Sequence, residues 1–326
     1  MSIQNFKYND FFNEIEIIEI GLLYGCNLEC PFCEINYHKL NKTPKEILQK
    51  KQLNFEDLRT FLRKFKKLRM IILCGTVSEP TLYYKFNELI TEIDSLSGSP
   101  VIRLHTNGNY SKKLNLRKKD IVYFGIDGIT QESYEKYRVK GNLQKVLENH
   151  KELKKIGCTT ILQLIEFEHN QEDEKNLKEF AELHNFDLID IKKSDNPEDI
   201  FDKIYPNVKN QFKVSLRKHQ MIFYKEIQTK ASEVIKCSSE INNQIFINYK
   251  GGVYPCYGWF DTTHIPTITI HNSTDSKIIN SVEERLNSKG ESCERECNET
   301  SVNYLRSKIR KLNETTNIPF DRNRLT

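Results

Sequence analysis

The strongest constraint on the fold is a repeated alternation of short apolar runs with amphipathic stretches between residues 15 and 194. The apolar runs predict strands at 15–24, 69–75, 101–106, 120–127, 159–167 and 187–193. Successive β-α units form a parallel sheet with right-handed crossovers, and six units are too few for the usual closed eight-unit barrel. We therefore expect an α/β fold, an open partial (β/α)6 TIM-like barrel, with ligands at the carboxyl ends of its strands.

The segments between these strands carry apolar residues at helical spacing. One stripe runs through Leu143, Val146, Leu147, His150 and Leu153. Such a stripe faces a hydrophobic core, so we expect His150 to be a core residue rather than a ligand.

Three cysteines follow the first predicted strand with the spacing C-x3-C-x2-C, namely Cys26, Cys30 and Cys33. Thiolates this close in sequence can bind one metal centre. Three sulfurs leave one iron of a [4Fe-4S] cluster without a protein ligand, and a small molecule can bind there. Zinc is the alternative, because its structural sites also use closely spaced cysteines, and His38 is the nearby candidate for a fourth ligand.

Four more cysteines lie in the C-terminal part of the chain: Cys237, Cys256, Cys293 and Cys297. Apolar residues on both sides of Gly251-Gly252 predict a hairpin whose second strand ends near Cys256. Four cysteines are sufficient for one fully ligated [4Fe-4S] cluster or for a zinc site. We expect a barrel at 1–200, a helical linker at 201–235 and a small auxiliary metal domain at 236–326.

Polar residues follow the later strands as well. They are Ser78, Glu79 and Pro80 after the second strand, Thr106 and Asn107 after the third, Asp127 with Arg138 after the fourth, and Gln163 and Asn170 at the fifth. Each has a local explanation: Pro80 can open a helix, Asn107-Gly108 is a common turn, and Asn170 precedes an acidic first helical turn. We expect Asn170 to be an N-cap, a role compatible with ligand contact.

Alternation along the strands predicts which side chains enter the barrel. Arg103 and His105 face inward in the third strand, Tyr123, Gly125 and Asp127 in the fourth, and Asp190 and Lys192 in the sixth. An inward charge needs a partner or a ligand. Pairing of Asp190 or Lys192 with a charge on a neighbouring strand is the simpler interpretation.

Composition argues against several classes of protein. The net charge is +4 with both signs interspersed, which gives no case for nucleic-acid binding. No apolar stretch approaches the roughly 20 residues of a membrane span, and residues 1–12 are too polar for a signal peptide, so we expect a cytoplasmic protein. The clustered cysteines indicate metal ligands rather than disulfides, with Cys74 and Cys158 as buried thiols.

Taken together, these motifs resemble the radical S-adenosylmethionine (SAM) enzymes, in particular the SPASM/twitch branch with its auxiliary iron-sulfur domain. The resemblance extends from about residue 16 to 297 and includes the three-cysteine loop and the G-x4-C pattern from Gly251 to Cys256. Four auxiliary cysteines are more similar to the shorter twitch form. Ser78 stands where the family commonly has glycine, and Gly125 stands where it usually has a serine that contacts SAM.

The resemblance implies two [4Fe-4S] clusters and a SAM site. Cys26, Cys30 and Cys33 would ligate the SAM-binding cluster, and Cys237, Cys256, Cys293 and Cys297 the auxiliary cluster. The implied SAM-binding residues are Phe32, Ser78, Glu79, Thr106, Asn107, Asp127, Arg138, Gln163 and Asn170. The implied partners are SAM, an electron donor such as flavodoxin or ferredoxin, and a small-molecule or peptide substrate.

The implied reaction is reductive cleavage of SAM to a 5'-deoxyadenosyl radical, which abstracts hydrogen from a C–H bond. We expect a radical SAM oxidoreductase or maturase that oxidises a sugar-like, aminocyclitol-like or peptide substrate, with Asp190 or Lys192 as the base that takes the departing proton. The alternatives are a peptide epimerase or another peptide-modifying maturase. A non-catalytic iron-sulfur or zinc protein is a more remote alternative.

Overall fold

The computed structural model describes residues 8–31, 33, 35, 52–75, 77–193, 243–256 and 266–287. The strands are β1 (Ile17–Ile20), β2 (Met70–Leu73), β3 (Val101–Thr106), β4 (Ile121–Gly125), β5 (Thr159–Glu166), β6 (Leu188–Lys193), β7 (Gln244–Ile247) and β8 (Val253–Tyr254). The helices are α1 (Tyr8–Glu14), α3 (Phe55–Leu62), α4 (Phe86–Ser95), α5 (Gln131–Tyr137), α6 (Leu143–Ile156), α7 (Gln171–His184) and α11 (Asp275–Asn287), with short 3-10 helices η2 (Pro80–Leu82) and η3 (Glu168–Asn170). All six strands predicted before residue 194 form within their predicted ranges.

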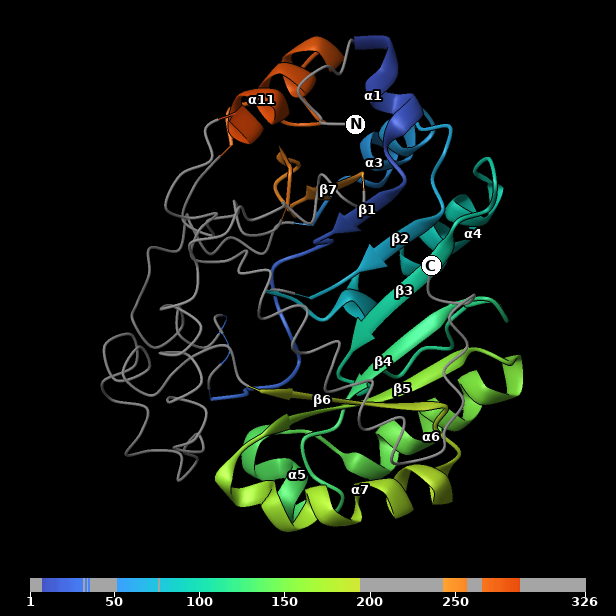
Figure 1. Ribbon diagram of the computed structural model, residues 1–326, viewed down its shortest axis with the longest axis vertical. Helices are drawn as coiled ribbons and strands as arrows, with labels where there is room; N and C mark the ends of the chain where they lie inside the picture. Colours follow the sequence, from blue (N-terminus) through green and yellow to red (C-terminus); the bar gives the residue numbers. More distant parts are fainter. Residues whose placement is uncertain are drawn as a thin grey trace, which may run out of the picture.

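The described strands form a single sheet in the order β6-β5-β4-β3-β2-β1-β7-β8 (Figure 1). Every pairing from β6 to β7 is parallel, and β8 pairs antiparallel with β7. Helices lie between successive parallel strands from β1 to β6, except between β3 and β4, where residues 107–120 form a connection without a helix. The third predicted β-α unit therefore lacks its helix. The predicted α/β class is confirmed, and the sheet is that of a partial TIM-like barrel.

The predicted hairpin forms as β7 and β8, but its position was not foreseen. β7 pairs in parallel with β1 from Ile17–Gln244 to Ile20–Ile247, and the Gly21 amide donates to the Ile247 carbonyl at 2.8 Å. The hairpin therefore extends the barrel sheet and does not form a separate sheet. The division of the chain into three parts remains a prediction, because residues 194–242 and 288–326 lie outside the described residues.

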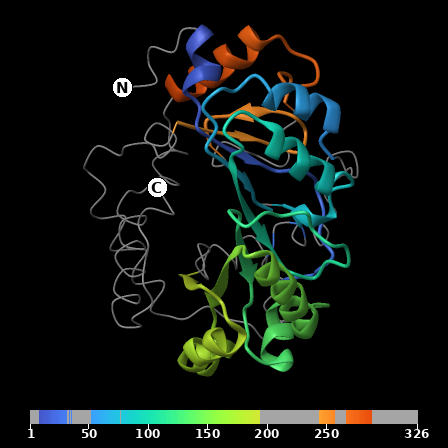
Figure 2. The ribbon, with the colours of Figure 1, turned by 90° about the vertical axis from the view of Figure 1, so that its right-hand side faces the viewer.

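The two faces of the sheet differ in chemistry. Ile102 and Leu104 are fully buried on the face that packs against the helices, while Arg103 and His105 alternate with them and are half-buried on the other face. Figure 2 shows α3, α4 and α6 on the same side of the sheet. The period-two prediction for β3 is thus confirmed, and the second face is the inner face of the barrel.

The predicted helical stripes pack into this core. Leu143, Val146, His150 and Leu153 of α6 are buried, and Leu147 is partly buried against the same cluster. The His150 ring stacks on Phe186 with centroids 3.8 Å apart, and its Nε2 lies 3.0 Å from Thr160 Oγ1. His150 is therefore a core residue with a polar partner, as predicted.

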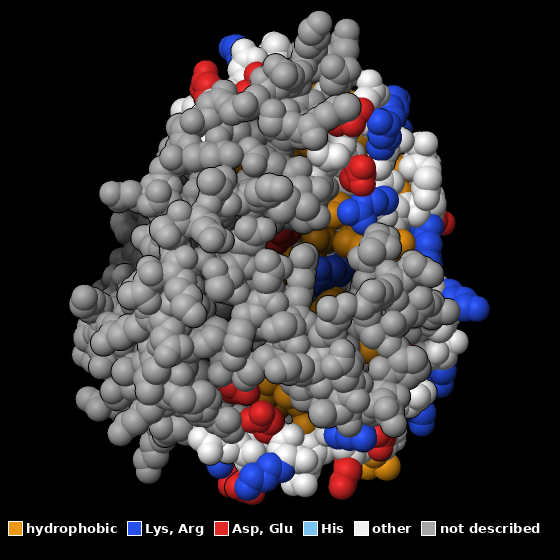
Figure 3. Space-filling view, viewed as in Figure 1, with side chains coloured by type: hydrophobic (Ala, Val, Ile, Leu, Met, Phe, Trp, Pro, Cys, Tyr) orange, Lys and Arg blue, Asp and Glu red, His pale blue; other side chains and the backbone are white. Residues whose placement is uncertain are grey.

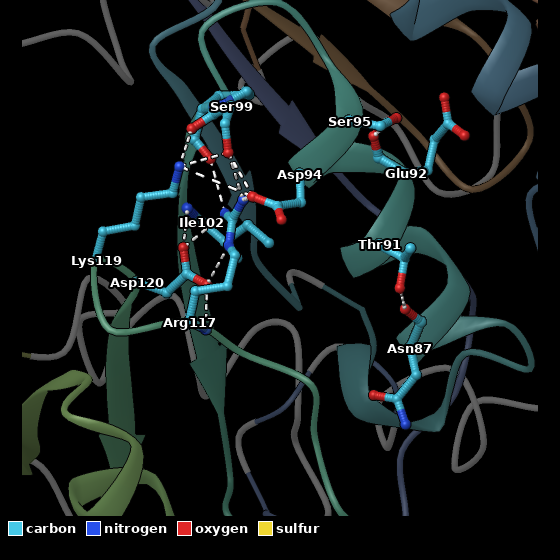
Figure 4. Close-up of polar contacts among 11 residues, drawn as sticks. Asn87, Thr91, Glu92, Asp94, Ser95, Ser99, Ile102, Arg117, Lys119 and Asp120 are labelled. Atoms are coloured by element: carbon cyan, nitrogen blue, oxygen red, sulfur yellow. Dashed lines mark hydrogen bonds and ion pairs between the residues drawn. The ribbon is translucent and has the colours of Figure 1, made fainter.

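A buried ion-pair cluster joins β3 and β4 at their amino ends, at the opposite edge of the sheet from the strand ends that carry the polar motifs (Figure 4). Asp120 is fully buried and accepts hydrogen bonds from the Ile102 amide at 2.9 Å and from Arg117 Nη2 at 2.7 Å. Arg117 Nη1 also reaches Asp94 at 2.6 Å. These contacts fix the start of both strands.

Among the described helices, none is long and apolar enough to cross a membrane.

Candidate active site

The cysteine loop leaves β1 and is fixed to the loop that follows β2. The Gly25 amide donates to the Val77 carbonyl at 3.0 Å, and the Glu79 amide donates to the Gly25 carbonyl at 2.9 Å. The sulfur of Cys26 accepts hydrogen bonds from the Leu28 amide and from Asn107 Nδ2, both at 3.4 Å. The loops after β1, β2 and β3 therefore converge on Cys26.

Cys30 lies deeper in the same loop. Its sulfur is 3.9 Å from Nη1 of Arg138, and its carbonyl accepts from the Cys33 amide at 3.2 Å. Burial raises the pKa of the Cys26 thiol to about 11 and that of the Cys30 thiol to about 12. Without a bound cation both groups are thus neutral thiols at pH 7, and a metal that binds them must displace their protons.

The donor set fits an iron-sulfur cluster. N–H groups of Leu28, Asn107 and Arg138 point at the sulfurs, and hydrogen bonds to sulfur stabilise thiolate ligands and tune cluster potentials. Among the described residues, no three Cys, His, Asp or Glu side chains are placed to hold one metal ion. A [4Fe-4S] cluster has a different requirement, since its cysteines bind different irons.

Glu79 joins the ends of β2 and β3. Its Oε1 accepts hydrogen bonds from the hydroxyls of Thr81 and Thr106, both at 2.7 Å, and its Oε2 accepts from the Asn107 amide at 2.7 Å. Burial raises the pKa of this carboxyl group, and the hydrogen bonds oppose that effect. The Glu79 side chain also caps η2, so the local interpretation, in which Pro80 opens a helix, is confirmed for a 3-10 helix.

Asp127 and Arg138 form a buried ion pair beside Cys30. Arg138 Nε donates to Asp127 Oδ2 at 2.6 Å, and the exposed fractions of the two side chains are 17% and 0%. The Ile165 amide donates to Asp127 Oδ1 at 2.7 Å. Gly125 lies directly below: a Cβ at this position would be 2.4 Å from Arg138 Nη2. Glycine in place of the family's serine therefore leaves room for the guanidinium.

Asn170 is the N-cap residue of α7, as predicted, but its side chain makes no capping hydrogen bond to the helix. Instead, its Oδ1 accepts from the Phe167 amide at 2.8 Å, and its Nδ2 donates to the carbonyls of Ile165 at 2.8 Å and Asp127 at 3.2 Å. The Asn170 side-chain amide therefore bonds to backbone groups at the ends of β4 and β5 rather than to the N–H groups of the first turn of α7. Asn170 thus fixes the turn that holds Asp127.

Gln163 and Asp190 meet on the inner face of β5 and β6. Gln163 Nε2 donates to Asp190 Oδ2 at 2.8 Å. Within the described residues the partner of Asp190 is thus a neutral amide, and not the charge that the simpler interpretation expected. The Lys192 side chain lies outside the described residues.

Several predicted site residues are not placed with this group. Phe32, Cys237, Cys293 and Cys297 lie outside the described residues. Cys256 follows β8 and is half-buried. Ser78, by contrast, lies at the cysteine loop: it forms a backbone bridge with Gly25, and its buried hydroxyl has no hydrogen-bond partner in the described part of the chain.

Two asparagines in the site were missed by the sequence reasoning. Asn27 Oδ1 accepts from Asn107 Nδ2 at 2.9 Å, and its Nδ2 donates to the Asn109 carbonyl at 2.6 Å. Asn109 Nδ2 in turn donates to the Tyr134 hydroxyl at 2.8 Å. The position of Asn27 between two of the cysteines was the available signal. These amides connect the cysteine loop to β3 and α5.

Comparison with known proteins identifies the class. Residues 20–181, just under half of the chain, match the domain of the radical SAM superfamily. This domain contains the cysteine loop and the polar ends of β2 to β5 described above. The family implies a [4Fe-4S] cluster and SAM as cofactors, and it supports an enzyme.

Two curated relatives share the name GTP 3',8-cyclase. The protein from Alkaliphilus metalliredigens is 28% identical over 192 residues, which are 56% of this chain and 56% of the relative. The protein from Aliarcobacter butzleri is 24% identical over 300 residues, covering 82% of this chain and 88% of the relative. The chain thus spans about half the length of the first relative and most of the second.

The fold is also that of Streptococcus suis SuiB. Its structure with the precursor peptide SuiA has a TM-score of 0.55 and 13% identity, covering 86% of this chain and 69% of SuiB. Its structure with SAM gives the same TM-score at 14% identity. At this identity the similarity establishes the fold alone.

Proposed function

We propose that this protein cleaves SAM reductively and uses the resulting 5'-deoxyadenosyl radical to remove a hydrogen atom from its substrate. The supporting observation is the cysteine loop within a radical SAM domain, where N–H groups of Leu28, Asn107 and Arg138 surround the sulfurs of Cys26 and Cys30. Cys26, Cys30 and Cys33 would hold a [4Fe-4S] cluster, which would pass the electron for this cleavage from an external donor to SAM.

In this proposal, the strand ends hold SAM next to the cysteine loop. The SAM-binding set remains Phe32, Ser78, Glu79, Thr106, Asn107, Asp127, Arg138, Gln163 and Asn170. Arg138 is suited to the methionine carboxylate because its guanidinium is held by Asp127 beside Cys30. Glu79 already accepts four hydrogen bonds from the protein, so it contributes mainly by holding Thr106 and Asn107 in place.

The proposed outcome is net oxidation of a sugar-like, aminocyclitol-like or peptide substrate. Cys237, Cys256, Cys293 and Cys297 would bind an auxiliary cluster that accepts an electron, as in the SPASM/twitch branch. Asp190 would accept the departing proton, since Gln163 engages its Oδ2 and its Oδ1 has no hydrogen-bond partner within the described residues. Lys192 is the alternative base. Either group would lie on the inner face of the barrel.

Iron content and SAM cleavage test the class. Anaerobically reconstituted protein is expected to hold about eight irons per chain, for two [4Fe-4S] clusters, and replacing Cys26, Cys30 and Cys33 with Ala is expected to leave about half. With dithionite and SAM, the wild type should form 5'-deoxyadenosine. Cys30→Ala should stop this reaction, while the matched control Cys158→Ala should retain it. Cleavage that persists in Cys30→Ala would refute the motif assignment.

The outcome of the reaction needs a labelled substrate. Deuterium at the target carbon should appear in 5'-deoxyadenosine, with one SAM consumed per two-electron-oxidised product. A product that differs from the substrate only by solvent-derived hydrogen at that carbon would instead identify an epimerase. Label that returns to SAM would also argue against net oxidation.

Reaction on a purine nucleotide is a second candidate. It is favoured by the similarity to the two proteins named GTP 3',8-cyclase. Incubation with GTP, SAM and dithionite should then raise 5'-deoxyadenosine formation and convert the nucleotide. No stimulation by GTP would leave oxidation of a sugar-like or peptide substrate as the better proposal.

A further inference from the structure

A cluster of three side chains occupies the inner face of the sheet on β3 and β4. Arg103 and His105 come from β3 and Tyr123 from β4, and the three are called the inner-face cluster here. His105 and Tyr123 are directly opposite each other in the β3-β4 register, and Arg103 lies two residues before His105. All three are half-buried. They lie on the face opposite the core residues Ile102 and Leu104.

The geometry of the cluster holds the guanidinium of Arg103 in one orientation. Arg103 Nε donates to His105 Nε2 at 3.0 Å, and Arg103 Cζ lies 4.6 Å from the centre of the Tyr123 ring. The His105 ring stacks on Tyr123 with centroids 4.4 Å apart and an interplanar angle of 11°. The stacked rings and the hydrogen bond thus support the arginine. The hydrogen bond engages Nε, and within the described residues the two terminal nitrogens have no hydrogen-bond partner.

Several other arginines in the described part of the chain have a carboxylate partner. Arg63 pairs with Glu92 at 2.6 Å, Arg69 with Glu16 at 2.7 Å, and Arg117 with Asp120 at 2.7 Å. No carboxylate among the described residues forms an ion pair with Arg103. On the inner face, Asp127 pairs with Arg138 at 2.6 Å, while Glu19 accepts from Gln244 Nε2 at 3.3 Å and Asp190 accepts from Gln163 Nε2 at 2.8 Å.

A half-buried guanidinium with a preset orientation and free terminal donors is suited to a planar or tetrahedral oxyanion. From this geometry we infer that Arg103 binds an anionic group of the substrate, a phosphate or a carboxylate, with His105 and Tyr123 as the residues that position it. The inference rests on the proposed function, because it takes the inner face of the barrel to be the substrate site.

The surroundings support an anion at this place. Burial raises the pKa of the Tyr123 phenol, which keeps its proton and can donate a hydrogen bond. In the coloured area at the centre of Figure 3, Lys or Arg side chains lie next to hydrophobic ones, with an Asp or Glu side chain at the edge of the same area. Arg103 and Asp190 both act electrostatically on Tyr123, and partial burial of a cation strengthens its attraction for an anion.

Binding of small anions tests the inference on the holoenzyme. Anaerobically reconstituted protein with SAM is dialysed to equilibrium against labelled pyrophosphate, labelled succinate or uncharged myo-inositol at constant ionic strength. We expect at least one anion to bind and myo-inositol not to compete. Arg103→Gln should weaken anion binding about 10- to 100-fold, as expected for loss of a charged hydrogen-bond donor. Arg103→Lys, which keeps the charge but loses the planar fork, should weaken it less.

Arg285 supplies the matched control. It also lies over a tyrosine, with Cζ 4.4 Å from the centre of the Tyr254 ring, and its Nη1 donates to the Val253 carbonyl at 2.7 Å. Arg285→Gln removes the same charge from a stacked arginine at a different place and should leave anion binding unchanged. Equal weakening by both substitutions would mean a general charge effect and would overturn the inference.

The two anions distinguish the sources of the ligand. Binding of pyrophosphate that depends on Arg103 indicates a phosphorylated substrate, and binding of succinate that depends on Arg103 indicates a carboxylate. Binding of neither anion to the wild type, or undiminished binding to folded Arg103→Gln, would overturn the inference. Formation of 5'-deoxyadenosine without substrate is measured in parallel. If the wild type formed no 5'-deoxyadenosine, the proposed function would be refuted. If the wild type formed 5'-deoxyadenosine but bound neither anion, only this inference would be refuted.

Discussion

Replacing Gly125 with Ala should destabilise the protein through one neighbour, Arg138. The new Cβ would lie 2.4 Å from Arg138 Nη2, 3.0 Å from Cζ and 3.5 Å from Nη1, and these are its three nearest contacts. Relief of the closest contact requires a shift of about 1 Å, since ordinary carbon-nitrogen contacts lie near 3.4 Å or beyond. A shift of this size would stretch the 2.6 Å hydrogen bond to Asp127 beyond useful length.

The expected magnitude follows from two opposing effects. Loss of a charge-assisted hydrogen bond costs about 1.5–3 kcal/mol. Alanine in place of glycine reduces the freedom of the unfolded chain and returns about 0.4–1 kcal/mol where the backbone tolerates it. We expect Gly125→Ala to lower the free energy of unfolding by about 1–2 kcal/mol, measured by anaerobic urea denaturation of the reconstituted protein.

A double-mutant cycle isolates the contact. Arg138→Met removes the guanidinium that the new methyl group would meet, so Gly125→Ala in that background should be neutral or slightly stabilising. The coupling between the two positions should then be about 2 kcal/mol, comparable to one charged hydrogen bond. If Gly125→Ala cost the same with and without Arg138, the clash would not be the cause and the reasoning would be refuted.

Two further predictions concern stability away from the cysteines. Burial lowers the pKa of His150 to about 4, so the folded state binds fewer protons than the unfolded state between this value and the ordinary pKa near 6.5, and stability should fall with decreasing pH in that window. Between pH 6.5 and 5.5 the loss should be about 1 kcal/mol, measured by urea denaturation, and His150→Gln should remove it; an equal loss in the variant would contradict the assignment. Asp120→Ala should cost about 3–5 kcal/mol because it leaves Arg117 partly buried without its main partner, while the exposed Asp94→Ala should cost under about 1 kcal/mol, and similar denaturation midpoints for both would count against the buried pair.

Local patterns in the sequence were sufficient for most of the barrel. The alternation in β3 and the stripe in α6 depend on which residues are apolar within a short window, and each element buries the side that the pattern predicts. The order of the first six strands also follows, because strands that are consecutive in the sequence usually lie side by side in a sheet. The carboxyl ends of these strands therefore converged as expected.

The details of the site depend on contacts between distant residues. The acidic turn after Asn170 correctly predicted its N-cap position, but its side chain bonds to the Phe167 amide and to two strand-end carbonyls instead of the helix. Similarly, the absence of a side chain at Gly125 is explained by the Arg138 guanidinium, which occupies the space that a Cβ would take. Neither partner can be found from spacing in one sequence, since each reflects how separate loops meet in space.

The pairing of β7 with β1 was equally invisible in sequence, and it bears on the two proposed clusters. β7 runs parallel to β1, with Gln244 opposite Ile17 at the amino end of β1. β8 runs antiparallel to β7, so the chain returns toward the level of Gln244 as it approaches Cys256. Cys256 therefore lies toward the amino end of β1, whereas the Cys26 loop follows its carboxyl end. The length of β1 alone separates these levels by roughly 10 Å. The cysteine loop and Cys256 thus belong to different metal sites if both bind iron, which is why removal of Cys26, Cys30 and Cys33 should leave the second half of the iron in place.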